Sequence, residues 1–335
     1  MSVTLKDIAA IVGVSESTVS RVLNGIPRAS EKTSKRILEV ARSLKYTPNE
    51  VARSLAKQQT HIIGLIISDI YNPYFAAVTG GIEEIAGLYG FNLIIATTGG
   101  QEEEELKYIT ILKEKRVDGM IFMSGRMPEI CEKTLIETLI PTVVVARQVK
   151  EEILPSIHID NVSESYQAVE YLIKLGHRKI AMISGDLGDI ESGYNRWLGY
   201  KKALADYNLP YRAELLEQGD FRMNSGKIAM GKLLQQNTVP TAVFAASDAM
   251  GVGAIKAAKE AGLRIPDDIS IMGFDNNLIS RACDPELTTI GQPVKDLGKN
   301  AMEILNKVIK GEKLEKRTYY LPCELIIRES TRLLI

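Results

Sequence analysis

The 335-residue sequence has few cysteines and no long apolar run. Cys131, Cys283 and Cys323 are odd in number and show no CxxC spacing, so we expect neither a disulfide framework nor a zinc site. No apolar run approaches the ~20 residues that cross a bilayer. Lys6 and Asp7 interrupt the N-terminal segment where a secretion signal needs an unbroken apolar stretch. We therefore expect a cytoplasmic protein without membrane contact.

The sequence also lacks the motifs of common catalytic and cofactor sites. GxGxxG, GxSxG and HExxH do not occur, and His61, His158 and His177 have no metal-ligand spacing. Residues 226–232 match GxxxxGK, but Leu233 stands where a phosphate loop needs Ser or Thr, and the segment has a helical pattern. We expect no enzymatic activity, no cofactor and no metal.

The composition is that of a folded protein, with 45% hydrophobic and 25% charged residues. The length favours two or three domains. The net charge of −1 conceals an asymmetry, because residues 1–60 hold ten Lys and Arg against five Asp and Glu. A basic N-terminal segment on an acidic body indicates that the first part binds a polyanion.

Residues 4–25 carry the signals of two short helices. Thr4 and Asp7 resemble a capping box, and the one-faced apolar spacing that follows stops at Gly13. Ser15 is a candidate N-cap for the second helix. The two helices are thus separated by a tight turn that contains glycine.

A third capped helix is expected from Ser30 onward, and three such helices predict a helix-turn-helix unit. The second helix has a polar outward face, and a helix of this length fits the major groove of B-DNA. The alternative is a three-helix bundle whose polar face is only solvated. The candidate DNA-binding residues on or beside this helix are Ser15, Glu16, Ser17, Thr18, Ser20, Arg21 and Asn24.

From residue 61 onward, apolar β-rich runs alternate with helical segments. Continuous apolar strands between helices predict parallel sheets covered on both faces, and two such series predict an α/β fold with two lobes. The acidic run at 101–105 is expected to form the solvated first turn of a helix. The expected strands lie at 61–70, 91–98, 117–124, 141–146, 156–160, 179–185, 241–247 and 270–275.

Polar and aromatic residues follow the ends of these strands, where open α/β sheets bind ligands. Aromatic rings beside Asp, Asn and Arg suit a polyhydroxylated ligand, and we expect Arg147 and Asp275 to clamp its opposite sides. Alternatively, Tyr74, Phe75 and Phe221 belong to the core and Asp275 caps a helix. The candidate effector-binding residues are Asn72, Tyr74, Phe75, Arg147, Asp160, Arg196, Phe221, Asp248, Asp275 and Gln292.

The run TLKDIAAIVGVSESTVSRVLNG, followed by YTPNEVARSLAKQQT, resembles the DNA-binding headpiece and hinge of the LacI/GalR family of bacterial transcription regulators. The similarity covers essentially the whole chain. It implies an all-α helix-turn-helix headpiece at 1–60 and a two-lobed α/β, periplasmic-binding-protein-like effector and dimerisation domain at 61–335. The implied lobes are about 61–161 with 292–322 and about 162–290 with 323–335, with chain crossings near 161, 290 and 322.

The resemblance also implies roles for single residues. It implies that the helix from Ser15 lies in the major groove and that Thr4 contacts DNA. Residues 49–57 correspond to a hinge helix that enters the minor groove as one of a pair, with DNA contacts from Asn49, Leu55 and Ala56 and with Leu55 as the wedge. Tyr194 stands where sugar-binding members often carry an arginine, and Arg196 is the candidate replacement.

These implications predict a homodimer that binds a palindromic double-stranded operator under the control of a small molecule, with a sugar or sugar derivative as the expected effector. One alternative is a solute-binding protein that shares the body. Another is a catabolite-control regulator that uses a protein co-regulator. Such members present basic residues after the position of Pro293, whereas Lys295 and Lys299 here accompany Glu303.

Overall fold

The computed structural model describes residues 3–26, 29–46, 59–124, 127–147, 149 and 153–334. The chain divides into two compact units, Met1–Thr60 and His61–Ile335. The hinge helix expected at 49–57, with Asn49, Leu55 and Ala56, lies outside the described residues.

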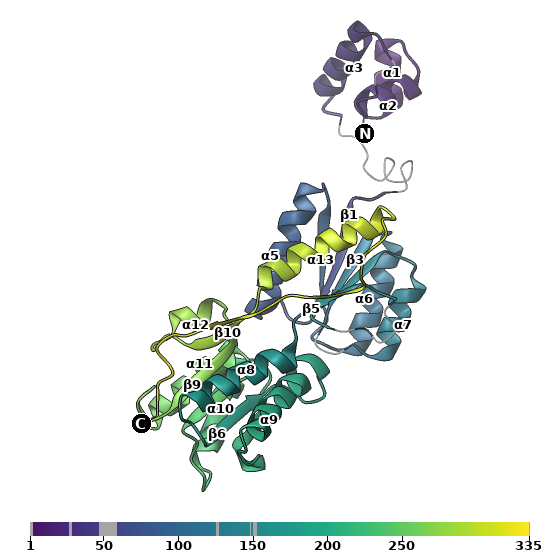
Figure 1. Ribbon diagram of the computed structural model, residues 1–335. Helices are drawn as coiled ribbons and strands as arrows, with labels where there is room; N and C mark the ends of the chain where they lie inside the picture. The colour runs from purple at the N-terminus through teal and green to yellow at the C-terminus, as the bar shows by residue number, and fades with distance from the viewer. Residues whose placement is uncertain are drawn as a thin grey trace. The chain divides into compact units, whose positions relative to one another are not determined.

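The first unit contains the three expected helices, with the caps that the sequence indicates. Thr4 and Asp7 form a capping box in which the Thr4 backbone N–H donates to Asp7 Oδ2 at 2.8 Å. Gly13 ends the first helix with φ of 77°. The hydroxyls of Ser15 and Ser30 each accept the N–H three residues later at 3.2 Å. The helices are α1 (Leu5–Val12), α2 (Glu16–Leu23) and α3 (Glu31–Ser43) (Figure 1).

The core of this unit is small and draws on all three helices. Val19 is the buried residue of α2, so the opposite face of that helix stays at the surface. Leu38, which follows the buried Ile37 on α3, is 40% exposed. The buried apolar residues are Ile8, Ala9, Val19, Ile37 and Ala41.

The second unit has two six-stranded sheets, which confirms the α/β prediction (Figure 1). The first sheet is parallel, in the order β11-β5-β4-β3-β1-β2, and the second has the order β12-β10-β9-β8-β6-β7 with β12 antiparallel to β10. The first sheet comprises β1 (Ile62–Ile67), β2 (Asn92–Thr97), β3 (Gly119–Met123), β4 (Thr142–Val145), β5 (Ser156–His158) and β11 (Thr318–Tyr320). The second comprises β6 (Ile180–Ser184), β7 (Leu216–Gln218), β8 (Ala242–Ala245), β9 (Ser270–Asp275), β10 (Thr288–Gly291) and β12 (Glu324–Ile326).

Helices cover these sheets, with α5 against α13 on one face of the first sheet and α6 beside α7 on the other. In the second lobe α8 packs on α9, and α10 packs on α11. The helices are α5 (Pro73–Leu88), α6 (Glu102–Glu114), α7 (Glu129–Glu137), α8 (Asn161–Lys174), α9 (Arg196–Asp206), α10 (Met223–Leu234), α11 (Asp248–Glu260), α12 (Leu278–Ala282) and α13 (Val294–Ile309), with a π-helical segment at Ile190–Asn195 and a 3-10 turn at Ala213–Leu215.

The chain passes between the two lobes three times, from β5 to α8, from β10 to α13 and from β11 to β12. The GxxxxGK match at 226–232 lies within α10, so the prediction of a helix there is confirmed. In the described part of the chain, no helix is both long and apolar enough to cross a membrane.

The expectation that the whole acidic run at 101–105 is solvated is wrong for Glu105. This fourth residue of α6 faces the sheet and is fully buried. Its carboxylate accepts hydrogen bonds from the Ser124 hydroxyl and, at 3.5 Å, from the Cys131 thiol. Burial raises the pKa of Glu105.

Two glycines allow α5 and α13 to pack backbone against backbone. A Cβ atom at Gly81 would lie 2.1 Å from the carbonyl oxygen of Lys295, and one at Gly298 would lie 2.0 Å from that of Val78. Neither carbonyl can move without shifting its helix. The close packing of these helices therefore requires glycine at both positions.

We predict opposite effects for alanine at two adjacent positions of α5. Gly81→Ala should lower the free energy of unfolding by about 1–3 kcal/mol, because the new methyl group overpacks the contact. Gly80 is the matched control, since it is exposed and a Cβ atom there would have no neighbouring atom within 4 Å; Gly80→Ala should stabilise the helix by about 0.5–1 kcal/mol. Urea unfolding followed by circular dichroism measures both, and equal effects would contradict the packing argument.

Candidate functional site

One candidate site is the exposed face of α2. Glu16, Ser17 and Arg21 are exposed there, while Val19 is buried on the opposite side. At 1.5 Å per residue the helix is about 12 Å long, a size that fits the major groove of B-DNA. Its side chains offer a cation, a carboxylate and a hydroxyl, which can bind phosphates and base edges.

The other candidate DNA-binding residues of this helix take part in its caps. The Ser15 hydroxyl lies 2.9 Å from that of Ser17 and 2.8 Å from that of Thr18. At the other end, Asn24 Nδ2 donates to the Ser20 carbonyl oxygen at 2.8 Å. These bonds fix the two ends of α2, and Thr4 fixes the start of α1 in the same way.

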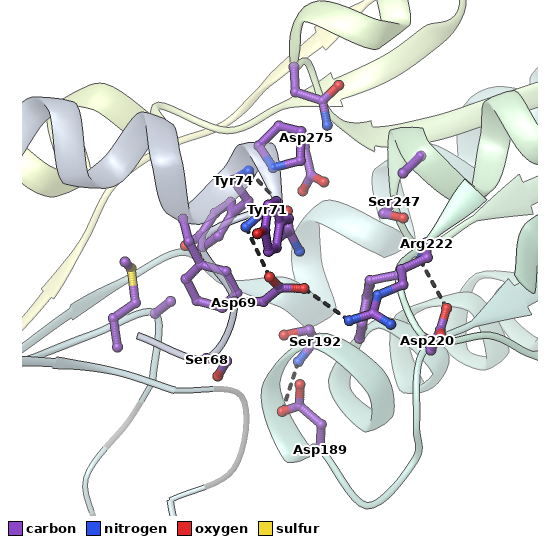
Figure 2. Close-up of a pocket in the computed structure, with 18 of the residues that line it drawn as sticks. Ser68, Asp69, Tyr71, Tyr74, Asp189, Ser192, Asp220, Arg222, Ser247 and Asp275 are labelled. Carbon is purple, nitrogen blue, oxygen red and sulfur yellow. Dashed lines mark hydrogen bonds and ion pairs between the residues drawn. The ribbon is translucent and has the colours of Figure 1, made fainter. Parts of the chain in front are cut away.

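The second candidate site is a cavity of about 880 Å³ between the two sheets of the second unit. Its walls lie at or just after the carboxyl ends of β1 to β10, and Figure 2 shows side chains from both lobes converging on it. The predicted residues that line it are Asn72, Tyr74, Phe75, Arg196, Phe221, Asp275 and Gln292.

The wall from the first lobe is formed largely by the start of α5. Asn72 caps this helix by accepting the Tyr74 N–H at 3.0 Å. The rings of Tyr74 and Phe75 meet edge to face with centroids 5.5 Å apart. Burial raises the pKa of Tyr74, so its hydroxyl remains a neutral donor and acceptor.

In the second lobe, Arg196 at the start of α9 is held by four neighbours. Its Nε donates to Asn161 Oδ1 at 2.8 Å, and its Nη1 donates to the Ala246 carbonyl oxygen at 2.6 Å. Nη1 also lies 3.8 Å from Asp275 Oδ1, and the guanidinium carbon is 3.7 Å from the centre of the Phe274 ring. The cavity wall thus contains a guanidinium group with a fixed orientation.

Asp275, at the end of β9, places a buried carboxylate on the same wall. Its φ of 121° is unusual for a non-glycine residue, a form of strain that often occurs at ligand sites. Gln292 Nε2 donates to its Oδ1 at 2.7 Å. Burial raises the pKa of Asp275, while Arg196 and Gln292 oppose that rise.

Arg147 does not form the clamp expected with Asp275, because it is not among the residues that line the cavity. Its guanidinium is buried, and Nη2 donates to Asp189 Oδ1 at 3.1 Å. This ion pair joins the segment after β4 to the segment after β6, so it connects the two lobes. The guanidinium beside Asp275 is that of Arg196.

Asp160 and Asp248 also follow strands but do not line the cavity. Asp160 caps α8 by accepting the Ser163 N–H at 3.0 Å. Asp248 is fully buried and accepts the Thr289 hydroxyl at 2.6 Å and the Asn277 N–H at 2.8 Å. Burial, with the nearby charge of Asp275, raises the pKa of Asp248. Both carboxylates therefore have structural partners.

Sequence reasoning missed an ion pair at the cavity wall. Arg222 Nη2 lies 3.1 Å from Asp69 Oδ2, and the Arg222 N–H donates to Asp220 Oδ1 at 3.1 Å (Figure 2). Asp69 follows β1 in the first lobe, whereas Arg222 follows β7 in the second. Asp69 lies in a run that we expected to be a strand, and β7 was not expected, because Leu216–Gln218 has no apolar run.

Within the described residues, no group of three or more His, Cys, Asp or Glu side chains is arranged to hold a metal ion. The residues that line the cleft offer hydrogen bonds, ion pairs and aromatic rings. These are the interactions by which proteins orient small organic ligands.

Comparisons with known proteins match both units. Residues 4–49 match the family described as bacterial regulatory proteins, lacI family, and residues 169–331 match the periplasmic binding protein-like domain. Catabolite control protein A of Priestia megaterium is 38% identical over 332 residues, which cover 99% of this chain and 100% of that protein.

Solved structures agree with these matches along nearly the whole chain. The lac repressor dimer bound to operator and the anti-inducer ONPF has a TM-score of 0.89 at 29% identity, with 99% of this chain and 100% of that chain covered. The complex of the transcriptional regulator CelR with cellobiose has a TM-score of 0.76 at 32% identity, with 98% and 99% covered. The sequence resemblance is thereby confirmed, and the chain belongs to the lacI family of bacterial regulatory proteins, which are DNA-binding transcription regulators.

Proposed function

We propose that this regulator is a cytoplasmic homodimer that binds a palindromic operator through α2 of each subunit and changes its operator affinity when a small polyhydroxylated molecule occupies the cleft. The observation that carries the proposal is the cavity wall formed by Arg196, Asp275 and Gln292 beside aromatic rings. The same chain also carries a headpiece in which the polar face of α2 is exposed.

The chemistry of the wall suits hydroxyl groups. Vicinal hydroxyls can donate to the Asp275 carboxylate and accept from the Arg196 guanidinium, while Tyr74, Phe75 and Phe221 can cover the C–H faces of a ring. The similarity to a CelR–cellobiose complex supports a sugar or sugar derivative. The same site would serve an inducer or a co-repressor.

The coupling of ligand to DNA would run through the lobes. Because both sheets line the cavity, a ligand that contacts both walls would stabilise one arrangement of the lobes over others. Coupling between two such sites is typically about 1–3 kcal/mol. We propose that residues 49–57 transmit this change to the headpieces.

An exposed apolar edge on the first lobe supports dimerisation. Ile94 and Ile95 on β2, at the edge of the sheet, are 37% and 41% exposed, and Leu88 near the end of α5 is 76% exposed. Apolar side chains on an edge strand favour contact with another protein surface. The similarity to the lac repressor dimer supports a second copy of this chain as that surface.

The structure favours a small molecule over a phosphoprotein co-regulator. Lys295 and Lys299 on α13 pair with the same carboxylate, at 2.8 Å and 2.6 Å from Glu84. These two hydrogen bonds lower the pKa of Glu84 to about 2. Glu84 thus offsets part of the positive charge that a phosphate group would need on this face.

Arg21→Ala should lower affinity for the specific operator by about ten- to a hundredfold, because an exposed arginine on α2 is expected to contact a base or phosphate. The unfolding of the second unit should not change, since Arg21 belongs to the other compact unit. Fluorescence anisotropy with an operator selected from a random DNA library measures the loss. Arg212→Ala, which removes an exposed arginine of the second unit, is the control, and equal losses in the two variants would contradict the role of α2.

Affinity for a neutral sugar should fall as the pH is lowered from 7.5 to 5. Burial raises the pKa of Asp275, and a ligand hydroxyl that donates to the ionised carboxylate favours the form that exists above that pKa. Binding is therefore strongest above the raised pKa and is lost as the pH falls through it. Asp275→Asn should reduce affinity at pH 7.5 by about tenfold or more and should flatten the profile.

Isothermal titration calorimetry measures the sugar affinity of the wild type and of Asp275→Asn at each pH. The ligand is the sugar that gives the largest thermal shift in a screened panel. Asp268→Asn is the matched control because Asp268 lies outside the cavity lining, on the surface beside Arg264. It should keep the wild-type profile. A flat profile in the wild type, or an unchanged one in Asp275→Asn, would remove Asp275 from the ligand site.

A further inference from the structure

Three arginines lie in or next to the cavity wall, among the residues that the structure describes, and each of them is paired with a carboxylate. The described lining holds four aspartates and two arginines, so acidic groups outnumber basic ones. Asp220 is the additional carboxylate at the second-lobe wall. The three ion pairs are Arg147–Asp189, Arg196–Asp275 and Arg222–Asp69, with N···O distances of 3.1, 3.8 and 3.1 Å.

The Arg222–Asp69 pair differs from the other two because its arginine is solvent-exposed. The Arg222 side chain is 71% exposed, whereas those of Arg147 and Arg196 are 10% and 6% exposed. Figure 2 shows the Arg222 side chain reaching across the cavity toward Asp69. An exposed arginine on a flexible stem can turn to an incoming anion when no carboxylate holds it.

We propose that Asp69 determines ligand specificity: by pairing with Arg222, it makes the cleft select uncharged polyhydroxylated ligands over their phosphate esters. This inference rests on the proposed function of the cleft as the ligand site. A phosphate group binds best to unpaired guanidinium or ammonium groups, and Arg222 is the exposed guanidinium of the described lining.

A phosphate ester would meet an electrostatic penalty in this cleft. Asp69 is bound through a single nitrogen of Arg222, Nη2. A phosphate that bound the other guanidinium N–H groups would lie close to the Asp69 carboxylate and be repelled by it, and a phosphate that displaced Asp69 would leave that carboxylate nearby without its cation. Asp220 accepts the Arg222 backbone N–H, so a second carboxylate stays near the same position. A neutral ligand keeps the ion pair and can donate hydroxyl hydrogen bonds to the carboxylates.

The test is Asp69→Asn, which removes the charge and retains the side-chain oxygen. Asp69 Oδ1 accepts the Tyr71 N–H at 2.9 Å, a bond that asparagine can also make, so the loop after β1 should be preserved. The probes are inorganic phosphate and matched pairs of a sugar and its phosphate ester, such as ribose with ribose 5-phosphate and glucose with glucose 6-phosphate. Thermal shift and isothermal titration calorimetry on the full chain measure binding.

The wild type should bind each phosphate ester more weakly than its parent sugar, whereas Asp69→Asn should bind inorganic phosphate and the esters at least about tenfold more tightly than the wild type does. Adding Arg222→Gln to the variant should abolish this gain. Asp268→Asn, which removes one of the two carboxylates that pair with the surface residue Arg264, is the matched control and should gain no such binding.

Several results would overturn the proposal. They are wild-type binding of a phosphate ester more tightly than of its parent sugar, absence of any gain in Asp69→Asn, and a gain that survives Arg222→Gln. A uniform loss of affinity for neutral ligands in Asp69→Asn, without phosphate binding, would instead make the pair only a connection between the lobes. A failure of the proposed function would be seen in a separate measurement, as an operator affinity that does not change with any ligand bound in the cleft.

Discussion

The guanidinium of Arg196 is the group on which the cleft depends. It joins the start of α9 to Asn161 at the first chain crossing, to the end of β8 through Ala246 and to Asp275 at the end of β9. Without it, Asp275 would be a buried carboxylate with no cation, which is costly in a protein interior. Arg196 thus orders the part of the cavity wall that contains Asp275, and with it the hydrogen bonds that this carboxylate can make to a ligand.

Two ion pairs also connect the two lobes. Arg147–Asp189 and Arg222–Asp69 each connect the segment after a strand of the first sheet to the segment after a strand of the second. The first pair is buried, so salt will screen it less than the exposed second pair. A ligand that adds contacts to both walls acts on the same interface. This arrangement is how a small molecule in the cleft would favour one lobe geometry.

Local signals in the sequence predicted much of this structure. Capping residues predicted α1 to α3, and apolar runs predicted eight of the strands. Both signals are local, because they depend only on residues that are neighbours in the sequence. β7 was missed because Leu216–Gln218 is short and lacks an apolar run, and Arg222 was missed with it. A position after a strand does not determine which way a side chain points. The Asp248 carboxylate, for example, accepts a hydrogen bond from Thr289 and does not line the cavity. The direction of such a side chain is known only from the assembled fold.

The central claim is that occupancy of the cleft changes operator affinity. The most direct measurement is a fluorescence anisotropy titration of the selected operator with the full-length chain, with and without a saturating neutral sugar identified by thermal shift. The account predicts a change of about 5- to 150-fold in operator affinity, with a reciprocal change in sugar affinity when operator is bound. Identical operator affinity with the cleft empty and saturated would contradict it.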